Sequence, residues 1–168
     1  MTRTVYILKC GETDKKAISK KAYDFVISKA KELIKTDDNL EICTDENGKP
    51  YFKKHPDFHF NISHSEDIIA VAMSSAPVGV DIEKLRDVNP KIAERHFTEK
   101  EKSYVKTNAD FFYVWTRKEA YLKKTGVGLR QSLSSFCVLE DNNIKTFIMK
   151  DCIVSVCGDN AKDFSLIV

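Results

Sequence analysis

The chain has 168 residues, of which 42% are hydrophobic and 31% charged, and 27 Lys and Arg residues stand against 25 Asp and Glu residues. This composition is typical of a folded globular protein and excludes collagen-like and disordered chains. The near balance of charge argues against a general nucleic-acid binder, and the longest apolar run, residues 68–73, is far shorter than the roughly 20 residues of a membrane-spanning helix.

The first half of the chain is expected to form one long helix and several strands. Residues 4–9 alternate around Val5 and Ile7 and predict a strand, and this segment turns polar too early for a secretory signal. Asp14 is the expected N-cap of a helix that extends to about Lys35, because apolar side chains recur at helical spacing behind it. Further strands are expected at residues 41–44, 51–52, 58–62, 68–74 and 78–83, with a turn at Asn47-Gly48.

The second half is expected to begin with helices and to return to strands. Helices are expected at residues 90–96, 99–106 and 109–125, then a helix stop and tight loop at Gly126-Val127-Gly128, then strands at 135–139, 146–149, 153–157 and 164–168. This order predicts an α+β fold with mostly antiparallel pairing. Because each half has one long helix and several strands, we expect two pseudo-symmetric lobes, residues 1–76 and 77–168, in one compact unit.

Two carboxylates mark the strand expected at residues 78–83. Asp81 and Glu83 share one face of an extended chain, with Cα atoms roughly 7 Å apart for a rise of about 3.3 Å per residue. Two carboxylates at this spacing can bracket one cation, and Mg²⁺ typically takes one or two carboxylates and completes its shell with water and substrate phosphates. An ordinary strand with an acidic, solvent-facing side explains the same pattern, and both interpretations stay open.

A second set of polar residues lies on the long helix expected at residues 109–125. Trp115, Glu119 and Lys123 recur every four residues and therefore share one side of the helix. Glu119 could supply a third carboxylate to the cation, and Lys123 could bind phosphate. A surface Glu–Lys pair, which stabilises a helix by about 0.2–0.5 kcal/mol, is the alternative.

A third polar group, Ser63-His64-Ser65, ends an apolar extended segment. A Ser-His-Asp type of triad needs a base held against its nucleophile, and these serines are too near in sequence to aim at His64 easily. A histidine that contacts phosphate is more plausible, and a capped turn is the alternative.

These groups belong to four short motifs that follow one another between about residues 46 and 138. They are Gly48-Lys49-Pro50, Phe-Asn-Ile-Ser-His-Ser at 60–65, Gly-Val-Asp-Ile-Glu at 79–83 and Trp-Thr-Arg-Lys-Glu-Ala-Tyr-Leu-Lys at 115–123. Any one of them is weak, but the four in this order resemble the 4′-phosphopantetheinyl transferase superfamily, and most of all a compact member of its surfactin-synthetase-activator type.

The resemblance implies a function and a set of roles. The enzyme would transfer the 4′-phosphopantetheine group of coenzyme A to a serine of an apo acyl or peptidyl carrier protein, as a monomer, and release adenosine 3′,5′-bisphosphate. Asp81, Glu83 and Glu119 would hold Mg²⁺ against the diphosphate. Lys123 and His64 would contact phosphates, and Lys49 would approach the phosphorylated nucleotide end of the coenzyme.

The acceptor serine must also lose a proton. Candidate bases are Glu119, directly or through a water, a metal-bound water, and Glu101, which lies in a segment that the family also tends to carry. Thr98-x-x-Glu101 is, however, a capping-box pattern at a helix start, so capping and catalytic roles for Glu101 are both open.

The sequence departs from the family in its first third. Longer members carry a basic stretch between the first strand and the first long helix, whereas here Cys10-Gly11-Glu12-Thr13 leads almost directly into the helix. The contacts to adenine and to the 3′-phosphate are therefore open. Lys16, Lys20 and Lys21 are the cations available nearby, and we assign Lys20 to these contacts.

Two other functions remain as rivals. One is a non-catalytic module that binds coenzyme A or a nucleotide on the same fold, and the other is an unrelated Mg²⁺-dependent phosphodiesterase that uses the same carboxylates. All three fit a cytoplasmic protein, since an odd count of five cysteines with no CxxC spacing argues against a disulfide framework.

Overall fold

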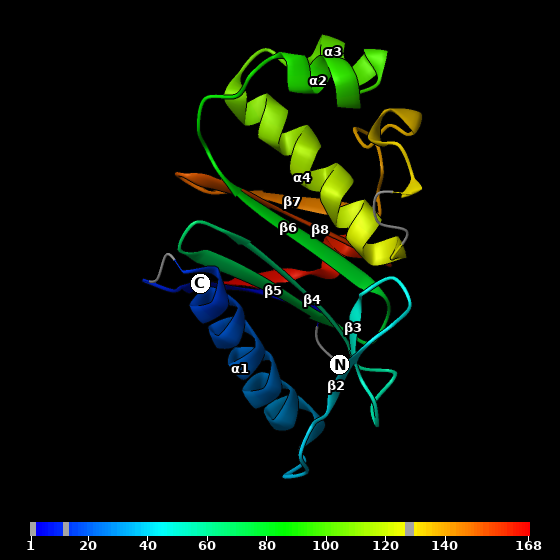
Figure 1. The fold of residues 1–168 in the computed structure, drawn as a ribbon. Helices are drawn as coiled ribbons and strands as arrows, with labels where there is room; N and C mark the ends of the chain where they lie inside the picture. The colour runs from blue at the N-terminus through cyan, green and yellow to red at the C-terminus, as the bar shows by residue number, and fades with distance from the viewer. Residues whose placement is uncertain (1–2, 12–13, 127–129) are drawn as a thin grey trace.

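The computed structural model describes residues 3–11, 14–126 and 130–168. Its elements in chain order are β1 (Thr4–Lys9), α1 (Lys15–Ile34), β2 (Ile42–Thr44), β3 (Pro50–Phe52), β4 (His59–Ser65), β5 (Ile68–Ser74), β6 (Val78–Lys84), α2 (Lys91–His96), α3 (Glu99–Tyr104), α4 (Asn108–Thr125), the 3₁₀ turn η2 (Leu133–Ser135), β7 (Ile144–Ile148), β8 (Cys152–Gly158), the 3₁₀ turn η3 (Ala161–Asp163) and β9 (Ser165–Ile167). They stack as helix, sheet, sheet, helix (Figure 1).

Two sheets form the middle of the stack, in the strand orders β4-β5-β1-β9 and β6-β8-β7, and β2 and β3 form a separate hairpin. All strand pairs are antiparallel except β1 with β9, which is parallel. The expected α+β fold with mostly antiparallel sheets is therefore confirmed. The last strand, β9, joins the sheet built from the first half of the chain, and the division at residue 76 stays a prediction.

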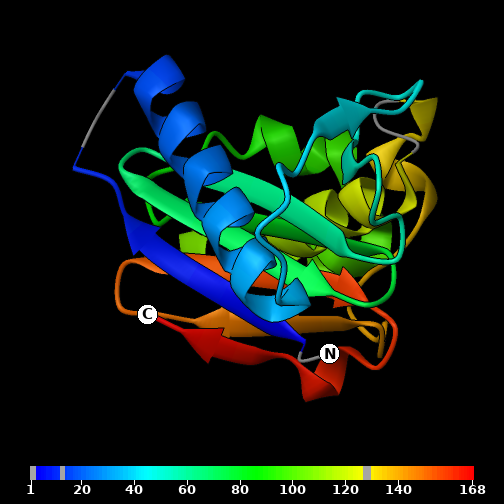
Figure 2. The same cartoon turned by 90° about the horizontal axis from the view of Figure 1, so that it is seen from below.

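Period-two alternation explains why the sheets stack. Along β1, Tyr6 points into the cluster beneath α1, whereas Val5 and Ile7 point into the cluster between the two sheets. Val80 and Ile82 of β6 enter that same central cluster from the other side. Figure 2 shows α1 crossing the outer face of the first sheet, and a third cluster lies beneath α4 on the outer face of the second sheet.

The helix boundaries follow the expected capping signals. The Asp14 carboxylate accepts a hydrogen bond from the Ala17 backbone at the start of α1, and α4 ends at Gly126, which has a left-handed φ of 72°. The rest of the expected tight loop, residues 127–129, lies outside the described residues. No described helix combines the length and apolar character needed to cross a membrane.

The expected strand at residues 135–139 is wrong. The turn η2 ends at Ser135, and residues 136–139 pair with no described strand. The physical reason is that side chains from two helices bind its backbone groups: Lys118 donates to the Leu133 and Phe136 carbonyls, Arg117 donates to the Val138 carbonyl, and Glu101 accepts from the Val138 N–H. Because these groups are satisfied by side chains, a strand partner is not needed.

Candidate active site

The site begins where β6 crosses α4. Gly79, Asp81 and Glu83 alternate with residues of the central cluster and so share the other side of β6. An added Cβ at Gly79 would lie 2.1 Å from the Ala120 carbonyl oxygen and 2.3 Å from the Lys124 backbone nitrogen. A glycine therefore lets the strand and helix backbones touch, and this contact brings the β6 carboxylates beside α4.

Asp81 is buried and stands at the centre of this crossing. Its Oδ1 accepts hydrogen bonds from Lys123 Nζ at 2.7 Å and from Ser63 Oγ at 2.8 Å. Its Oδ2 is buried and has no hydrogen-bond partner among the described residues. Burial raises the pKa of the Asp81 carboxyl, and Lys123 and Ser63 oppose that rise. A buried carboxylate with one oxygen unpartnered is well suited to take a cation.

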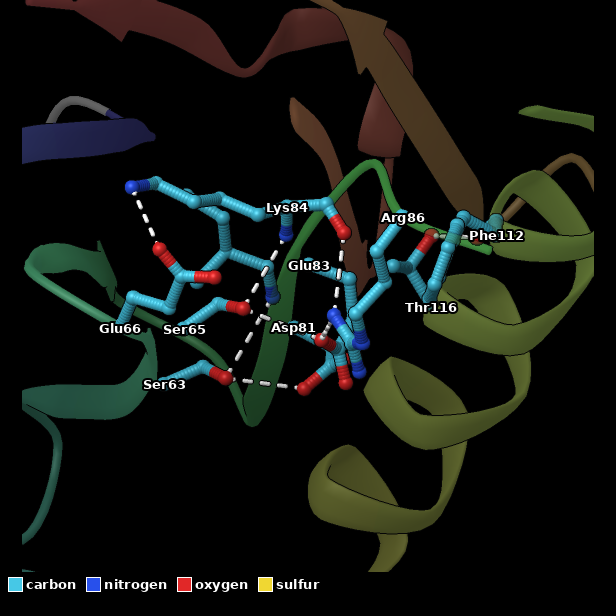
Figure 3. Close-up of polar contacts among 10 residues, drawn as sticks. Ser63, Ser65, Glu66, Asp81, Glu83, Lys84, Arg86, Phe112 and Thr116 are labelled. Atoms are coloured by element: carbon cyan, nitrogen blue, oxygen red, sulfur yellow. Dashed lines mark hydrogen bonds and ion pairs between the residues drawn. The ribbon is translucent and has the colours of Figure 1, made fainter. Parts of the chain in front are cut away.

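Glu83 is half-buried and has partners of the same two kinds. Its Oε2 accepts from Ser65 Oγ at 3.1 Å and from Arg86 Nη1 at 2.8 Å. Figure 3 shows the two serines of β4 pointing toward the two carboxylates of β6, with Arg86 reaching Glu83 from beyond the strand end. Each carboxylate is thus held by one hydroxyl and one side-chain cation.

Glu119 approaches the pair from α4. Burial raises the pKa of its carboxyl, repulsion from Asp81 adds to the rise, Lys123 opposes it, and Glu83 adds a smaller contribution. In the described parts of the chain, no three His, Cys, Asp or Glu side chains form a ready metal cluster. Asp81 and Glu83 nevertheless supply the one or two oxygen ligands that Mg²⁺ typically takes from a protein, and the unpartnered Asp81 oxygen fits such an ion.

A cavity of about 260 Å³ opens beside Glu119, and residues of both halves line it, among them Lys49, Asn61, Glu119 and Lys123. Lys49 comes from the β2–β3 hairpin, where Gly48 turns the chain with a φ of 81°. Its Nζ donates to the Lys124 carbonyl at 2.7 Å, and burial lowers the pKa of its ammonium group. A cation on each side makes this cavity suited to a phosphorylated ligand.

Two candidate phosphate contacts lie apart from this group. His64 is exposed and alternates with Ser63 and Ser65, so it faces the opposite side of β4. Lys20 is exposed on α1 and pairs with Asp24 at 2.9 Å. The roles of His64 and Lys20 toward coenzyme A stay predictions.

Glu101 is enclosed in a different part of the molecule. Its carboxylate completes the capping box with Thr98, and it also accepts from the Val138 backbone and pairs with Lys118 at 2.8 Å, where both side chains are 0% exposed. The capping alternative is confirmed. A role for Glu101 as base stays a prediction, and its partners do not include Asp81, Glu83 or Glu119.

Sequence reasoning did not assign roles to Asn61, Ser63, Ser65 or Arg86. The first three carried a signal, since they alternate along an extended segment and so share a face. Arg86 carried none, because its place beside Glu83 depends on the turn of the chain after β6.

Comparison with known proteins places these residues in a family. Residues 77–158 match the family model described as the 4′-phosphopantetheinyl transferase superfamily. The chain is 43% identical over 99 residues to the 4′-phosphopantetheinyl transferase psf-1 of Bacillus pumilus, covering 55% of this chain and 42% of that protein. It is 40% identical over 119 residues to the 4′-phosphopantetheinyl transferase Sfp of Bacillus subtilis, covering 67% of this chain and 52% of that protein.

A similar match, 38% identical over 119 residues, links the chain to the 4′-phosphopantetheinyl transferase gsp of Aneurinibacillus migulanus and covers 67% of this chain and 49% of that protein. The chain spans about half the length of the curated relatives it matches. The matched region holds β6 and α4, which carry the three carboxylates and Lys123. Residues 77–158 thus belong to the 4′-phosphopantetheinyl transferase superfamily, and the relatives named above support a transferase of the surfactin-activator type.

Proposed function

We propose that this protein transfers the 4′-phosphopantetheine group from coenzyme A to a serine hydroxyl of an apo carrier protein. The observation that carries the proposal is the buried Asp81 with an unpartnered oxygen, beside a cavity whose lining includes Lys49, Glu119 and Lys123. Such a cavity offers the cations of Lys49 and Lys123 to a diphosphate, and Lys123 links it to Asp81, which would hold the counter-ion. The match of residues 77–158 to the 4′-phosphopantetheinyl transferase superfamily supports phosphopantetheine transfer as the reaction at this site.

In the proposed reaction the serine oxygen bonds to the phosphorus next to the pantetheine arm, and the bond from that phosphorus to adenosine 3′,5′-bisphosphate breaks. Negative charge grows on the phosphoryl oxygens, and Lys123 and Lys49 would stabilise it. Asp81, Glu83 and Glu119 would hold Mg²⁺, which when bound polarises the phosphoryl oxygens as a Lewis acid.

The serine proton needs an acceptor, and Glu119 is the group that we assign to this role, directly or through a water. Burial raises the pKa of the Glu119 carboxyl toward neutral pH, and a base whose pKa lies nearer the working pH is a better general base. The protein would act as a cytoplasmic monomer, and its five free cysteines suit a reducing compartment.

The direct test is incubation of the purified chain with coenzyme A, Mg²⁺ and several apo carrier proteins, followed by mass spectrometry. We expect the carrier to gain one phosphopantetheine group. Coenzyme binding without a mass gain on any carrier would favour a non-catalytic module, and nucleotide release without a carrier would favour a phosphodiesterase.

Asp81→Asn tests the metal part of the proposal. The substitution keeps the volume of the side chain and removes the charge that would hold Mg²⁺. Loss of a partner that only orients a metal ligand typically costs about 10- to 100-fold, so loss of a ligand itself should lower turnover by at least about 100-fold. Turnover with an unchanged Mg²⁺ dependence in this variant would contradict the assigned site.

A further inference from the structure

The edges of the two sheets meet without pairing as strands. β4 is the edge strand of the first sheet and β6 is the edge strand of the second. Because β6 pairs with β8 on one side only, every second backbone N–H of β6 points away from its own sheet. Buried N–H groups of this kind need partners.

Side chains of β4 supply these partners in sequence. Asn61 Oδ1 accepts from the Val80 N–H at 2.8 Å, Ser63 Oγ from the Ile82 N–H at 3.4 Å, and Ser65 Oγ from the Lys84 N–H at 3.1 Å. We call these three contacts the side-chain ladder. It joins two sheet edges through alternate side chains of one strand and alternate N–H groups of the other.

The two serines of the ladder do something that Asn61 does not. A hydroxyl has one donor and two acceptor sites, so a serine that accepts from an N–H can still donate. Ser63 donates to Asp81 at 2.8 Å and Ser65 donates to Glu83 at 3.1 Å, as Figure 3 shows. Each carboxylate is therefore tied, through one hydroxyl, to the backbone N–H that follows it along β6.

We propose that Ser63 and Ser65 are positioning residues for the metal-binding carboxylates, an inference that rests on the proposed Mg²⁺ site. The hydroxyls fix the rotamers of Asp81 and Glu83. They also hold these carboxylates at a set position relative to the contact between β4 and β6. Both serines are 7% exposed, so water does not replace them readily. Partners of this kind around a metal site typically change metal affinity by about 10- to 100-fold when they are removed.

Alanine substitutions at three buried serines separate positioning from simple structural support. Ser63→Ala, Ser65→Ala and the control Ser74→Ala each remove a buried hydroxyl that accepts from a backbone N–H, which for Ser74 is that of Ala76 at 3.2 Å. Of the three, only Ser63 and Ser65 also donate to a carboxylate. We would titrate the full chain with Mn²⁺, without coenzyme or carrier, and follow free Mn²⁺ by electron paramagnetic resonance. The dissociation constant should rise about 10-fold or more in Ser63→Ala and Ser65→Ala and stay within about twofold in Ser74→Ala.

A chemical-unfolding curve for each variant guards against loss of the fold. If Ser65→Ala does not fold, Ser65→Cys keeps nearly the same shape with a weak donor and should also weaken Mn²⁺ binding, while Ser65→Thr keeps the hydroxyl and should restore it. If Ser63→Ala and Ser65→Ala fold and bind Mn²⁺ like the wild type, the positioning role is overturned. Absence of saturable Mn²⁺ binding to the wild type, or equal binding by Asp81→Asn, would overturn the metal site itself and the positioning role with it.

Discussion

A single missing side chain sets the distance between β6 and α4. At Gly79 the obstacles to a Cβ are backbone atoms of the helix, the Ala120 carbonyl oxygen and the Lys124 nitrogen. Backbone inside a helix cannot turn aside as a flexible side chain can. The glycine of the Gly-Val-Asp-Ile-Glu motif therefore acts through packing, and it places Asp81 within reach of Lys123.

Replacing Gly79 with alanine should push the helix from the strand. Overpacking of a core typically costs about 1–3 kcal/mol, and we expect the upper end of this range in the free energy of unfolding measured in urea. Gly158→Ala is the matched control, because a Cβ there meets the Phe164 ring at 3.1 Å, and a ring can shift. Equal losses in the two variants would contradict the role of Gly79.

For single residues, the sequence predicts on which face of a strand a side chain lies, but not which distant residues contact it. Period-two alternation predicts that Asp81 and Glu83 share a face, and the structure agrees. Two residues hold Asp81. Ser63 lies 18 positions before it in the chain, and Lys123 lies 42 positions after it. No local pattern encodes such pairings, because they depend on how two sheets and a helix meet.

Among the elements, α4 does the most to organise its surroundings. The Lys118 ammonium group is fully buried, binds the carbonyls of Leu133 and Phe136, and pairs with Glu101 of α3. Arg117 on the same helix holds the Val138 carbonyl. These contacts fasten α3 and residues 133–138 to α4, so a segment without strand pairing is still ordered.

Breaking the Lys118–Glu101 pair should be costly, because it leaves a buried charge without its partner. Lys118→Met and Glu101→Gln should each lower the free energy of unfolding by about 3–5 kcal/mol. Lys100→Met breaks an exposed pair with Glu140 and should leave the free energy of unfolding nearly unchanged, because solvent screens such a pair. The comparison is made by urea denaturation of the three variants.

The Glu101→Gln variant also tests the catalytic role of Glu101. If Glu101 only caps and pairs, Glu101→Gln should keep its activity per folded molecule under conditions where the folded fraction is known. Loss of turnover in fully folded protein would instead support Glu101 as the base.

Element boundaries were predictable where the signals are local. The capping residues Asp14 and Thr98 mark helix starts in the sequence and in the structure. Residues 135–139 have strand-like composition, but the cations that bind their backbone stand on α4, 18 and 21 positions earlier in the chain. Tertiary contacts therefore overrode a local preference, as they commonly do for strands.

For the molecule as a whole, the side-chain ladder that connects the two sheets lies next to the cavity. Asn61 belongs to the side-chain ladder and also lines the cavity, together with Lys49 from the β2–β3 hairpin and Lys123 from α4. A ligand seated there contacts both halves of the chain. Its binding energy therefore adds to the energy that holds the two halves together, in addition to the apolar cluster between the sheets.

Coenzyme A with Mg²⁺ should consequently stabilise the whole fold. A ligand at 100 times its dissociation constant stabilises the native state by about 2.7 kcal/mol, which for a chain of this size raises Tm by roughly 5–10 °C. The shift should be much smaller in Lys49→Ala and Lys123→Ala, which lose a cation of the cavity. Lys53→Ala, on the same hairpin but paired outward with Glu41, should keep the full shift. Equal shifts in Lys49→Ala and Lys53→Ala, measured by calorimetry, would place the coenzyme elsewhere.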